Sequence, residues 1–224
     1  MSDPSSHDPK RVPPSSAHSE RRAGRQKSAA KHQAILEAAV RLFLSQGLRK
    51  TSLDAVARDA KVSKQTVYSH FADKDDLFRA VIVRKVSSYH FDAGVEPVAG
   101  AAAEALHELG TRMLSLLADP QVIAMMRVVS AESPTHPRIA QLFYESGPER
   151  ATRTIEGTLI RLHERGELAI PNAREAAIDF LSLLKGEHHF RMLMGVAQPL
   201  DAATRNHHIA RIVARFMRAY ATSA

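Results

Sequence analysis

An all-α fold is the class that this sequence predicts, and three observations support it. Apolar side chains recur at helical spacing through most of the chain, as residues 35–43 illustrate. No stretch shows the sustained polar and β-branched alternation of a half-buried strand. Pro and Gly residues fall between long periodic segments, so they divide the chain into pieces of helical length.

The first 27 residues are expected to form a disordered basic arm, because they hold four Pro and many Ser but no apolar cluster. A helical pattern starts at Ser28. Gly47 is placed to end this helix, in a positive-φ conformation that glycine adopts at low cost.

A short second helix should follow, with Thr51 or Ser52 as its N-cap residue. The next few residues leave room only for a tight turn, and Ser63 can cap a third helix over 64–71. Asp73 is placed to cap a fourth helix. We therefore expect a small helical unit over 28–73.

The rest of the chain, 74–224, is expected to be a larger helical body. The pattern predicts helices near 100–118, 121–131, 137–165, 173–195 and 201–221. Gly147-Pro148 interrupts one of them and is expected to kink or split it.

Positive charge is concentrated in the first third. Residues 1–71 hold 13 of the 31 basic side chains and 6 of the 24 acidic ones, an excess equal to the chain's net charge of +7. This asymmetry indicates a head that binds a polyanion such as nucleic acid, with a merely solvated basic tail as the alternative. The chain has no Cys, which excludes disulfides and thiolate sites and fits a reducing cytoplasm. No apolar run is long enough to predict a membrane span, and the N-terminus lacks a signal-peptide pattern.

The unit over 28–73 has the order and turn length of a helix-turn-helix. Small residues stand where its second and third helices should cross, and Val67 and Phe71 should bury one side of the third. Amides and hydroxyls can read base edges, and lysines can reach phosphate or guanine. The candidate DNA-facing residues are Lys64, Gln65, Thr66, Tyr68, Ser69, His70 and Lys74. A polar, solvated helix face is the alternative.

The segment "GLRKTSLDAVARDAKVSKQTVYSHFADKDDLF" resembles the DNA-binding domain of TetR/AcrR-type transcriptional repressors, and the likeness covers about residues 30–80. Lys61 departs from the family's usual glycine, and Gln65 stands where Gly, Ala or Pro is frequent. The resemblance implies a homodimer on a palindromic operator, usually a repressor released by a small molecule, with activation left open. It adds Thr51 or Ser52 to the DNA contacts. The basic residues Arg21, Arg22, Arg25 and Lys27 could lie in a minor groove or attract DNA without specificity.

Residues 121–200 resemble, more loosely, the AefR-like C-terminal domains, so the body is expected to bind an effector and to dimerise. Flexible or aromatic apolar residues that suit a pocket, or an ordinary core, are Met113, Met125, Met126, Phe143, Tyr144, Phe180 and Met192. Arg127 and Glu132 are expected to form an ion pair, with ligand contact as the alternative. The apolar stripes of the last two helices predict a dimer surface at Phe180, Leu183, Leu184, Ile209, Ile212, Val213 and Phe216.

Histidines occur in two adjacent pairs, His188-His189 and His207-His208. Adjacent side chains on a helix diverge, so they do not favour one shared metal ion, and we expect no metal and no cofactor. No recognisable catalytic motif supports an enzyme. An architectural DNA-binding protein without an effector is the other alternative, but it leaves the large neutral body unexplained.

Overall fold

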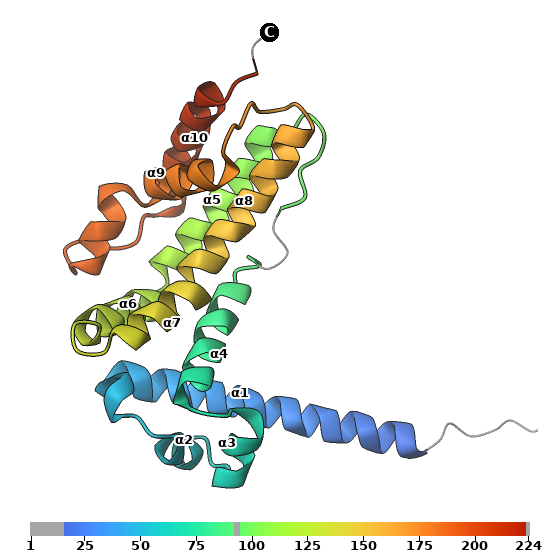
Figure 1. The fold of residues 1–224 in the computed structure, drawn as a ribbon, viewed down its shortest axis with the longest axis vertical. Helices are drawn as coiled ribbons and strands as arrows, with labels where there is room; N and C mark the ends of the chain where they lie inside the picture. The colour runs from blue at the N-terminus through green and yellow to red at the C-terminus, as the bar shows by residue number, and fades with distance from the viewer. Residues whose placement is uncertain (1–15, 92–94, 223–224) are drawn as a thin grey trace, which may run out of the picture.

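The computed structural model describes residues 16–91 and 95–222, with backbone alone for 16–25. All regular structure in these residues is helical, which confirms the predicted fold class. Figure 1 shows α1 crossing one end of the molecule and α4 rising from it to the body. The helices are α1 (Ser16–Lys50), α2 (Leu53–Asp59), α3 (Lys64–His70), α4 (Lys74–Ser87), α5 (Ala102–Ala118), α6 (Pro120–Glu132), α7 (Pro137–Ser146), α8 (Pro148–Glu164), α9 (Ala173–Leu193) and α10 (Ala202–Ala219).

Helix α1 begins at Ser16, so the expected start at Ser28 is corrected. Residues 23–31 are mainly Ala, Arg, Gln and Lys, which propagate a helix without needing an apolar stripe. The expectation of disorder for 1–15 lies outside the described residues.

Side-chain caps fix where the three short N-terminal helices begin. Ser52, Ser63 and Asp73 each accept a hydrogen bond from the backbone N–H three residues later, at 3.1, 3.1 and 2.7 Å. The predicted caps Ser63 and Asp73 are therefore confirmed. Of the two candidates for α2, Ser52 is the cap and Thr51 is not.

Gly47 ends the regular part of α1, as predicted, with φ 82° and ψ 167°. The positive φ favours glycine here, and a Cβ on Gly47 would lie 2.0 Å from Oε1 of Glu132 in α6, so that side chain would have to move. The end of α1 thus packs directly against the body.

The N-terminal core extends beyond the helix-turn-helix. Phe43 of α1 and Phe78 of α4 are fully buried and meet edge to face, with ring centroids 5.7 Å apart. Met125 and Val129 of α6 and Leu142 of α7 belong to the same cluster. Helices α6 and α7 are therefore packed onto the N-terminal helices through a continuous apolar core.

A second core joins α5, α8, α9 and α10, in which α8 packs on α9 and α10 on α5. The rings of Phe180 and Phe216 meet edge to face at 5.2 Å. Figure 1 shows α9 and α10 at the end of the molecule distant from α2 and α3.

Six of the seven residues predicted for a dimer surface lie in this second core, so that prediction is corrected. Each is at most 5% exposed: Phe180, Leu184, Ile209, Ile212, Val213 and Phe216. Only Leu183 is exposed, at 39%. An apolar stripe shows that a helix face is buried but not what covers it, and here helices of the same chain do.

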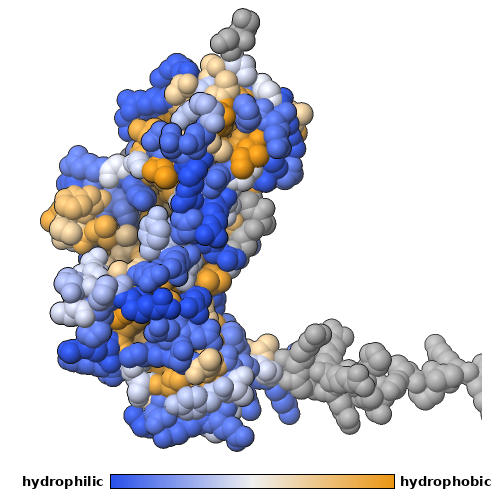
Figure 2. Space-filling model, viewed as in Figure 1, coloured by the Kyte–Doolittle hydropathy of each residue, from blue (hydrophilic) through white to orange (hydrophobic). Residues whose placement is uncertain are grey.

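Two breaks shape the body. Gly147-Pro148 splits the long predicted helix into α7 and α8, in agreement with the prediction. A break that was not predicted lies at Gly186 in α9, with φ 49° and ψ −163°. Beyond it, Phe190, Met194 and Val196 are about 60% exposed. Figure 2 shows an apolar patch where this end of α9 projects from the body.

A bend at Asp119 and Pro120 separates α5 from α6. Oδ1 of Asp119 caps α6 by accepting hydrogen bonds from the N–H groups of Gln121 and Val122, at 2.7 and 3.3 Å. Within the described ranges no single helix is long and apolar enough to cross a membrane. Helices α5 and α6 meet those criteria only as a pair bent by 64°.

Candidate DNA-binding surface and ligand cavity

The turn between α2 and α3 is a Schellman motif. The N–H of Val62 donates to the carbonyl of Ala57 at 3.0 Å, and the N–H of Lys61 donates to that of Arg58 at 3.2 Å. Lys61 has φ 54°, the left-handed conformation for which this motif favours glycine. The chain therefore keeps this glycine-type turn with lysine in it, at a cost of about 1 kcal/mol.

Helix α3 is held by one buried side. Val67 is fully buried, and Phe71, the residue that ends the helix, is 3% exposed. The residues on the other side are the exposed Lys64, Gln65, Tyr68 and Ser69, with Thr66 and His70 partly buried. The predicted division of this helix into a packing side and a polar outer side is present.

Some of the outer polar groups already have partners. The ammonium of Lys64 lies 2.5 Å from Oδ2 of Asp54 in α2, and the hydroxyl of Ser69 donates to a carbonyl one turn back at 2.8 Å. The amide of Gln65 and the hydroxyl of Tyr68, 56% exposed, have no partner among the described residues. These two groups are the most available for an external partner.

Two predicted DNA contacts bind the protein's own backbone. Thr51 is 2% exposed, and its hydroxyl donates to the carbonyl of Gly47 at 2.7 Å. Its prediction as a contact is therefore corrected: it positions the start of α2. The ammonium of Lys74 donates to the carbonyls of Leu48 and the next residue, at 2.8 and 3.3 Å, and so holds the end of α1. Ser52 is exposed.

The basic residues of α1 are described only in part. Lys27 is exposed, whereas the side chains of Arg21, Arg22 and Arg25 lie outside the described residues. Farther along α1, the ring of His32 lies 5.4 Å from that of His70. The end of α3 therefore packs on α1.

Helix α6 joins three parts of the molecule. Oε2 of Glu132 accepts a hydrogen bond from the backbone N–H of Arg49 at 3.2 Å. The guanidinium of Arg127 donates to the carbonyls of Leu193 and Met192, at 2.7 Å each, at the end of α9. The expected Arg127–Glu132 ion pair is therefore wrong, because each side chain reaches the backbone of a different helix.

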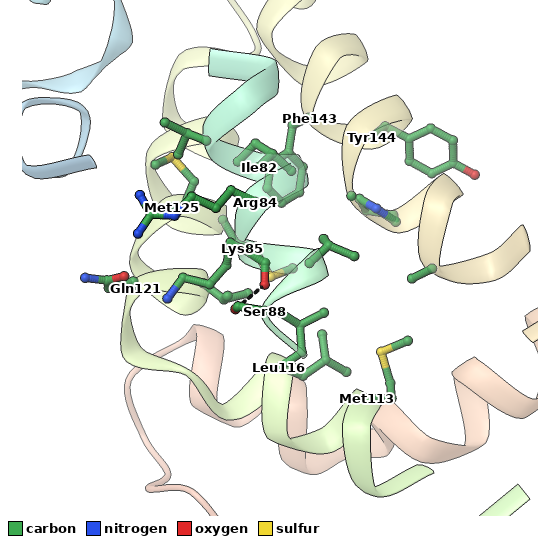
Figure 3. A pocket seen from close by; sticks show the side chains of 18 of the residues that line it. Ile82, Arg84, Lys85, Ser88, Met113, Leu116, Gln121, Met125, Phe143 and Tyr144 are labelled. Atoms are coloured by element: carbon green, nitrogen blue, oxygen red, sulfur yellow. Dashed lines mark hydrogen bonds between the residues drawn. The ribbon is translucent and has the colours of Figure 1, made fainter. Parts of the chain in front are cut away.

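A cavity of about 720 Å³ lies in the body and is bounded by α1 and by α4 to α9. Figure 3 shows Met113, Ile82 and Phe143 directed into it. Five of the residues predicted for a pocket line this cavity: Met113, Met125, Met126, Phe143 and Tyr144. Phe180 and Met192 do not, since Phe180 lies in the second core and Met192 is buried near the end of α9.

Two basic groups of the lining are neutralised by carboxylates. Arg84 lies 3.6 Å from Glu37, and Lys85 lies 3.0 Å from Asp119. The hydroxyl of Tyr89 also donates to Asp119, at 2.8 Å. Burial opposes ionisation of Asp119, but the bonds from Tyr89 and Lys85 outweigh it and lower the carboxyl pKa. Burial, with the same bond, raises the pKa of Tyr89 to about 12.

Two lining groups on α9, Lys185 and His189, were not predicted for the pocket. Partial burial lowers the pKa of Lys185, although much of its side chain is exposed. His189 is 5% exposed, and neither ring nitrogen has a hydrogen-bond partner among the described residues. Burial, and then the charges of Lys185 and His188, lower its pKa to about 4. The missed signal was their i, i+4 spacing, which continues the stripe of Ile178 and Leu181 on the same helix.

The histidine pairs do not build a metal site in the part of the chain described here, which holds no cluster of three His, Cys, Asp or Glu ligands. Nε2 of His208 lies 3.0 Å from the carbonyl of Leu184, which fits a bond between α10 and α9. His207 is exposed.

A helix-turn-helix with an exposed polar outer side, packed onto a helical body that holds a cavity, defines the class of DNA-binding regulators. Comparison with known families agrees. Residues 35–81 match the tetR family of bacterial regulatory proteins, and residues 104–222 match the C-terminal domain of AefR-like transcriptional repressors. The chain belongs to the TetR family of transcriptional regulators, which are not enzymes.

Two curated relatives show how the similarity is distributed. The regulator AcrR of Shigella flexneri is 42% identical over 60 residues, 27% of this chain and only 28% of AcrR. The regulator YdeS of Bacillus subtilis is 26% identical over 190 residues, 82% of this chain and 88% of YdeS. The higher identity is therefore confined to about a quarter of the chain.

Solved structures resemble the whole fold. A TetR-family regulator from Mesorhizobium loti superposes with a TM-score of 0.73 at 26% identity, covering 87% of this chain and 98% of that one. The flavonoid-responsive regulator FrrA superposes with a TM-score of 0.72 at 32% identity, covering 86% and 98%.

Proposed function

We propose that this chain is a ligand-responsive, sequence-specific transcriptional regulator that binds a palindromic operator as a homodimer. The observation that carries the proposal is the outer side of α3, where Gln65 and Tyr68 are exposed and have no partner in the described ranges, while Val67 and Phe71 are buried beneath them. A side-chain amide can make two hydrogen bonds to one base edge, and a tyrosine hydroxyl suits a phosphate. Helix α3 thus has the features of a major-groove reader.

The proposed contacts are exposed or partly exposed. They are Ser52, Lys64, Gln65, Thr66, Tyr68, Ser69, His70 and Lys74, with Lys64, Gln65 and Thr66 as base readers. Lys74 has two ammonium hydrogens on backbone carbonyls, which leaves the third for a phosphate. On binding DNA, Lys64 would break its ion pair with Asp54 and contact the DNA instead.

A second copy of the chain is proposed to cover the apolar surface of α9. Leu183 is 39% exposed, and Phe190, Met194 and Val196 are between 58% and 65% exposed. Two-fold symmetry sets such a surface against itself and places two copies of α3 on one side of DNA. Adjacent major grooves require them to be about 34–36 Å apart.

The cavity is proposed to hold the effector. Its walls include α4, which begins a few residues after α3, and α6, whose last residue, Glu132, accepts a hydrogen bond from the backbone of Arg49. A ligand that displaces either helix would change the spacing of the two α3 helices and weaken operator binding. A relative described as flavonoid-responsive supports a small organic effector. We infer that the protein represses transcription and that the effector relieves this repression. We also infer that it acts in the cytoplasm, where the bacterial DNA lies.

Selection of bound sequences from a random DNA library tests the DNA function. We expect a palindromic site whose affinity exceeds that of scrambled DNA by a factor of about 10³ or more. Gln65→Ala should weaken binding about tenfold and change the preferred base within each half-site, whereas Tyr68→Phe should weaken all sequences alike. Gln198→Ala, an exposed glutamine between α9 and α10, is the matched control.

Binding that ignores sequence would instead support an architectural protein. A monomer at micromolar concentration by analytical ultracentrifugation would contradict the homodimer, and an unchanged base preference in Gln65→Ala would contradict the assignment of α3.

A further inference from the structure

The cavity has a polar region on an otherwise mainly apolar wall. One stripe of α9 contributes Ile178, Leu181, Ser182, Lys185 and His189 to the lining. The apolar residues come first along this stripe and the polar ones last. Met113, Met125 and Phe143 line other walls, which also carry the basic side chains Arg41, Arg84 and Lys85.

The charge of the lining is not balanced. Three other basic side chains of the lining have acidic partners, in the pairs Arg41–Asp59 (2.7 Å), Arg84–Glu37 (3.6 Å) and Lys85–Asp119 (3.0 Å). Lys185 has no acidic partner and no hydrogen bond among the described residues. The cavity therefore offers one uncompensated cation to whatever it holds.

His189 adds a second unmet requirement. Its neutral imidazole provides one N–H donor and one acceptor nitrogen, and neither is bonded within the described part of the chain although the residue is 95% buried. An unsatisfied buried polar group costs about 1–3 kcal/mol, so such groups usually serve a partner. The site is thus incomplete without a ligand that can hydrogen-bond.

Gly186 separates the two groups. A Cβ at this position would have no heavy atom within 4 Å, so space does not select glycine here. The backbone conformation selects glycine instead, because the region with φ 49° and ψ −163° is essentially restricted to glycine. The break lets α9 turn between Lys185 and His189 while both line the cavity.

We propose that the cavity binds an apolar organic molecule with one acidic oxygen group, a carboxylate or a phenolate, which pairs with Lys185 and hydrogen-bonds to His189. This inference rests on the proposed function in taking the cavity as the effector site. A cavity of about 720 Å³ suits an organic ligand of this kind.

Isothermal titration calorimetry on the full chain without DNA tests the ligand class. The probes are two matched pairs: biphenyl-4-carboxylate with its carboxamide, and 7-hydroxyflavone with 7-methoxyflavone. At a pH where the acidic probe is ionised, at least one acidic member should bind about tenfold more tightly than its neutral partner. Which pair shows the preference distinguishes a carboxylate from a phenolate.

Variants test the assignment of residues. Lys185→Met and Lys185→Gln should both abolish the preference for the acidic member, and His189→Leu should weaken its binding about tenfold. Arg191→Met removes an exposed cation of the same helix outside the lining and should bind as the wild type does. Thermal melts establish that each variant is folded. If Lys185→Met does not fold, Lys185→Gln, which keeps a long polar side chain, still provides the test.

Equal binding of acidic and neutral partners overturns the proposal, as does a preference retained in both Lys185 variants. Absence of binding by all four probes at about 1 mM also overturns it. A gel shift with the selected operator is run separately. Specific operator binding with no acid preference would leave the DNA function intact and reject only this inference.

Discussion

Glu132, the last residue of α6, accepts a hydrogen bond from the backbone N–H of Arg49 at 3.2 Å, where α1 gives way to α2. The same helix lines the cavity with Met125 and Met126 and binds the end of α9 through Arg127. One helix therefore touches the cavity, the end of α9 and the turn between α1 and α2. A displacement of α6 by a ligand would act directly on that turn.

Removal of this bond should weaken communication between cavity and DNA. In Glu132→Ala, the factor by which a cavity ligand lowers operator affinity should fall about threefold or more, because the contact with Arg49 is lost. Glu132→Gln keeps an acceptor oxygen and should retain most of the effect. Dissociation constants measured with and without ligand provide the test.

Glu164→Ala is the control for this prediction, since Glu164 is exposed at the end of α8 and has no ion pair among the described residues. A full ligand effect in Glu132→Ala would show that the signal travels by another route.

Lys61→Gly should stabilise the protein. Lys61 has φ 54°, which costs a residue with a Cβ about 1 kcal/mol, so glycine should raise the free energy of unfolding by about 0.5–1 kcal/mol. Lys61→Ala removes the same charge but keeps the strain, and it should give no such gain. Urea unfolding curves compare the two, and equal stabilities would argue against strain at this turn.

Acidification should cost stability through His189. The folded protein holds its pKa near 4, against an ordinary value of 6.5, mainly because of burial. Between these values the unfolded chain binds a proton that the folded chain does not, so stability falls as pH drops from 6.5 to 4. The fall should reach about 2 kcal/mol.

His189→Gln removes this titration, so the stability advantage of the wild type should shrink over that pH range. His207→Gln, which removes an exposed imidazole, should follow the wild type. Parallel curves for wild type and His189→Gln would contradict the depressed pKa.

Local chemistry explains what could be predicted. Ser63 and Asp73 cap their helices because the partner N–H is three residues away, and Gly147-Pro148 breaks a helix through its own covalent geometry. The outer side of α3 also followed from the sequence, because Val67 and Phe71 define which side is buried.

Predictions that depended on distant neighbours were less successful. Thr51 was a plausible cap, but the fold buries its hydroxyl against Gly47 and gives the cap to Ser52. Phe180 and Phe216 formed a clear stripe, yet this chain's own helices cover it. The sequence alone does not distinguish Lys185 and His189 from other residues of their helix. The tertiary structure does, because both line the cavity and neither has a hydrogen-bond partner among the described residues.

The sequence by itself determined the helical class, most helix boundaries and the exposed polar side of α3, because helix periodicity, caps and breaks act over a few residues. Only the tertiary structure decided that α6 joins the cavity to Arg49, and which apolar faces remain exposed on α9. The reason is physical: burial and backbone partners depend on which helices meet, and a helix's own periodicity carries no record of its neighbour.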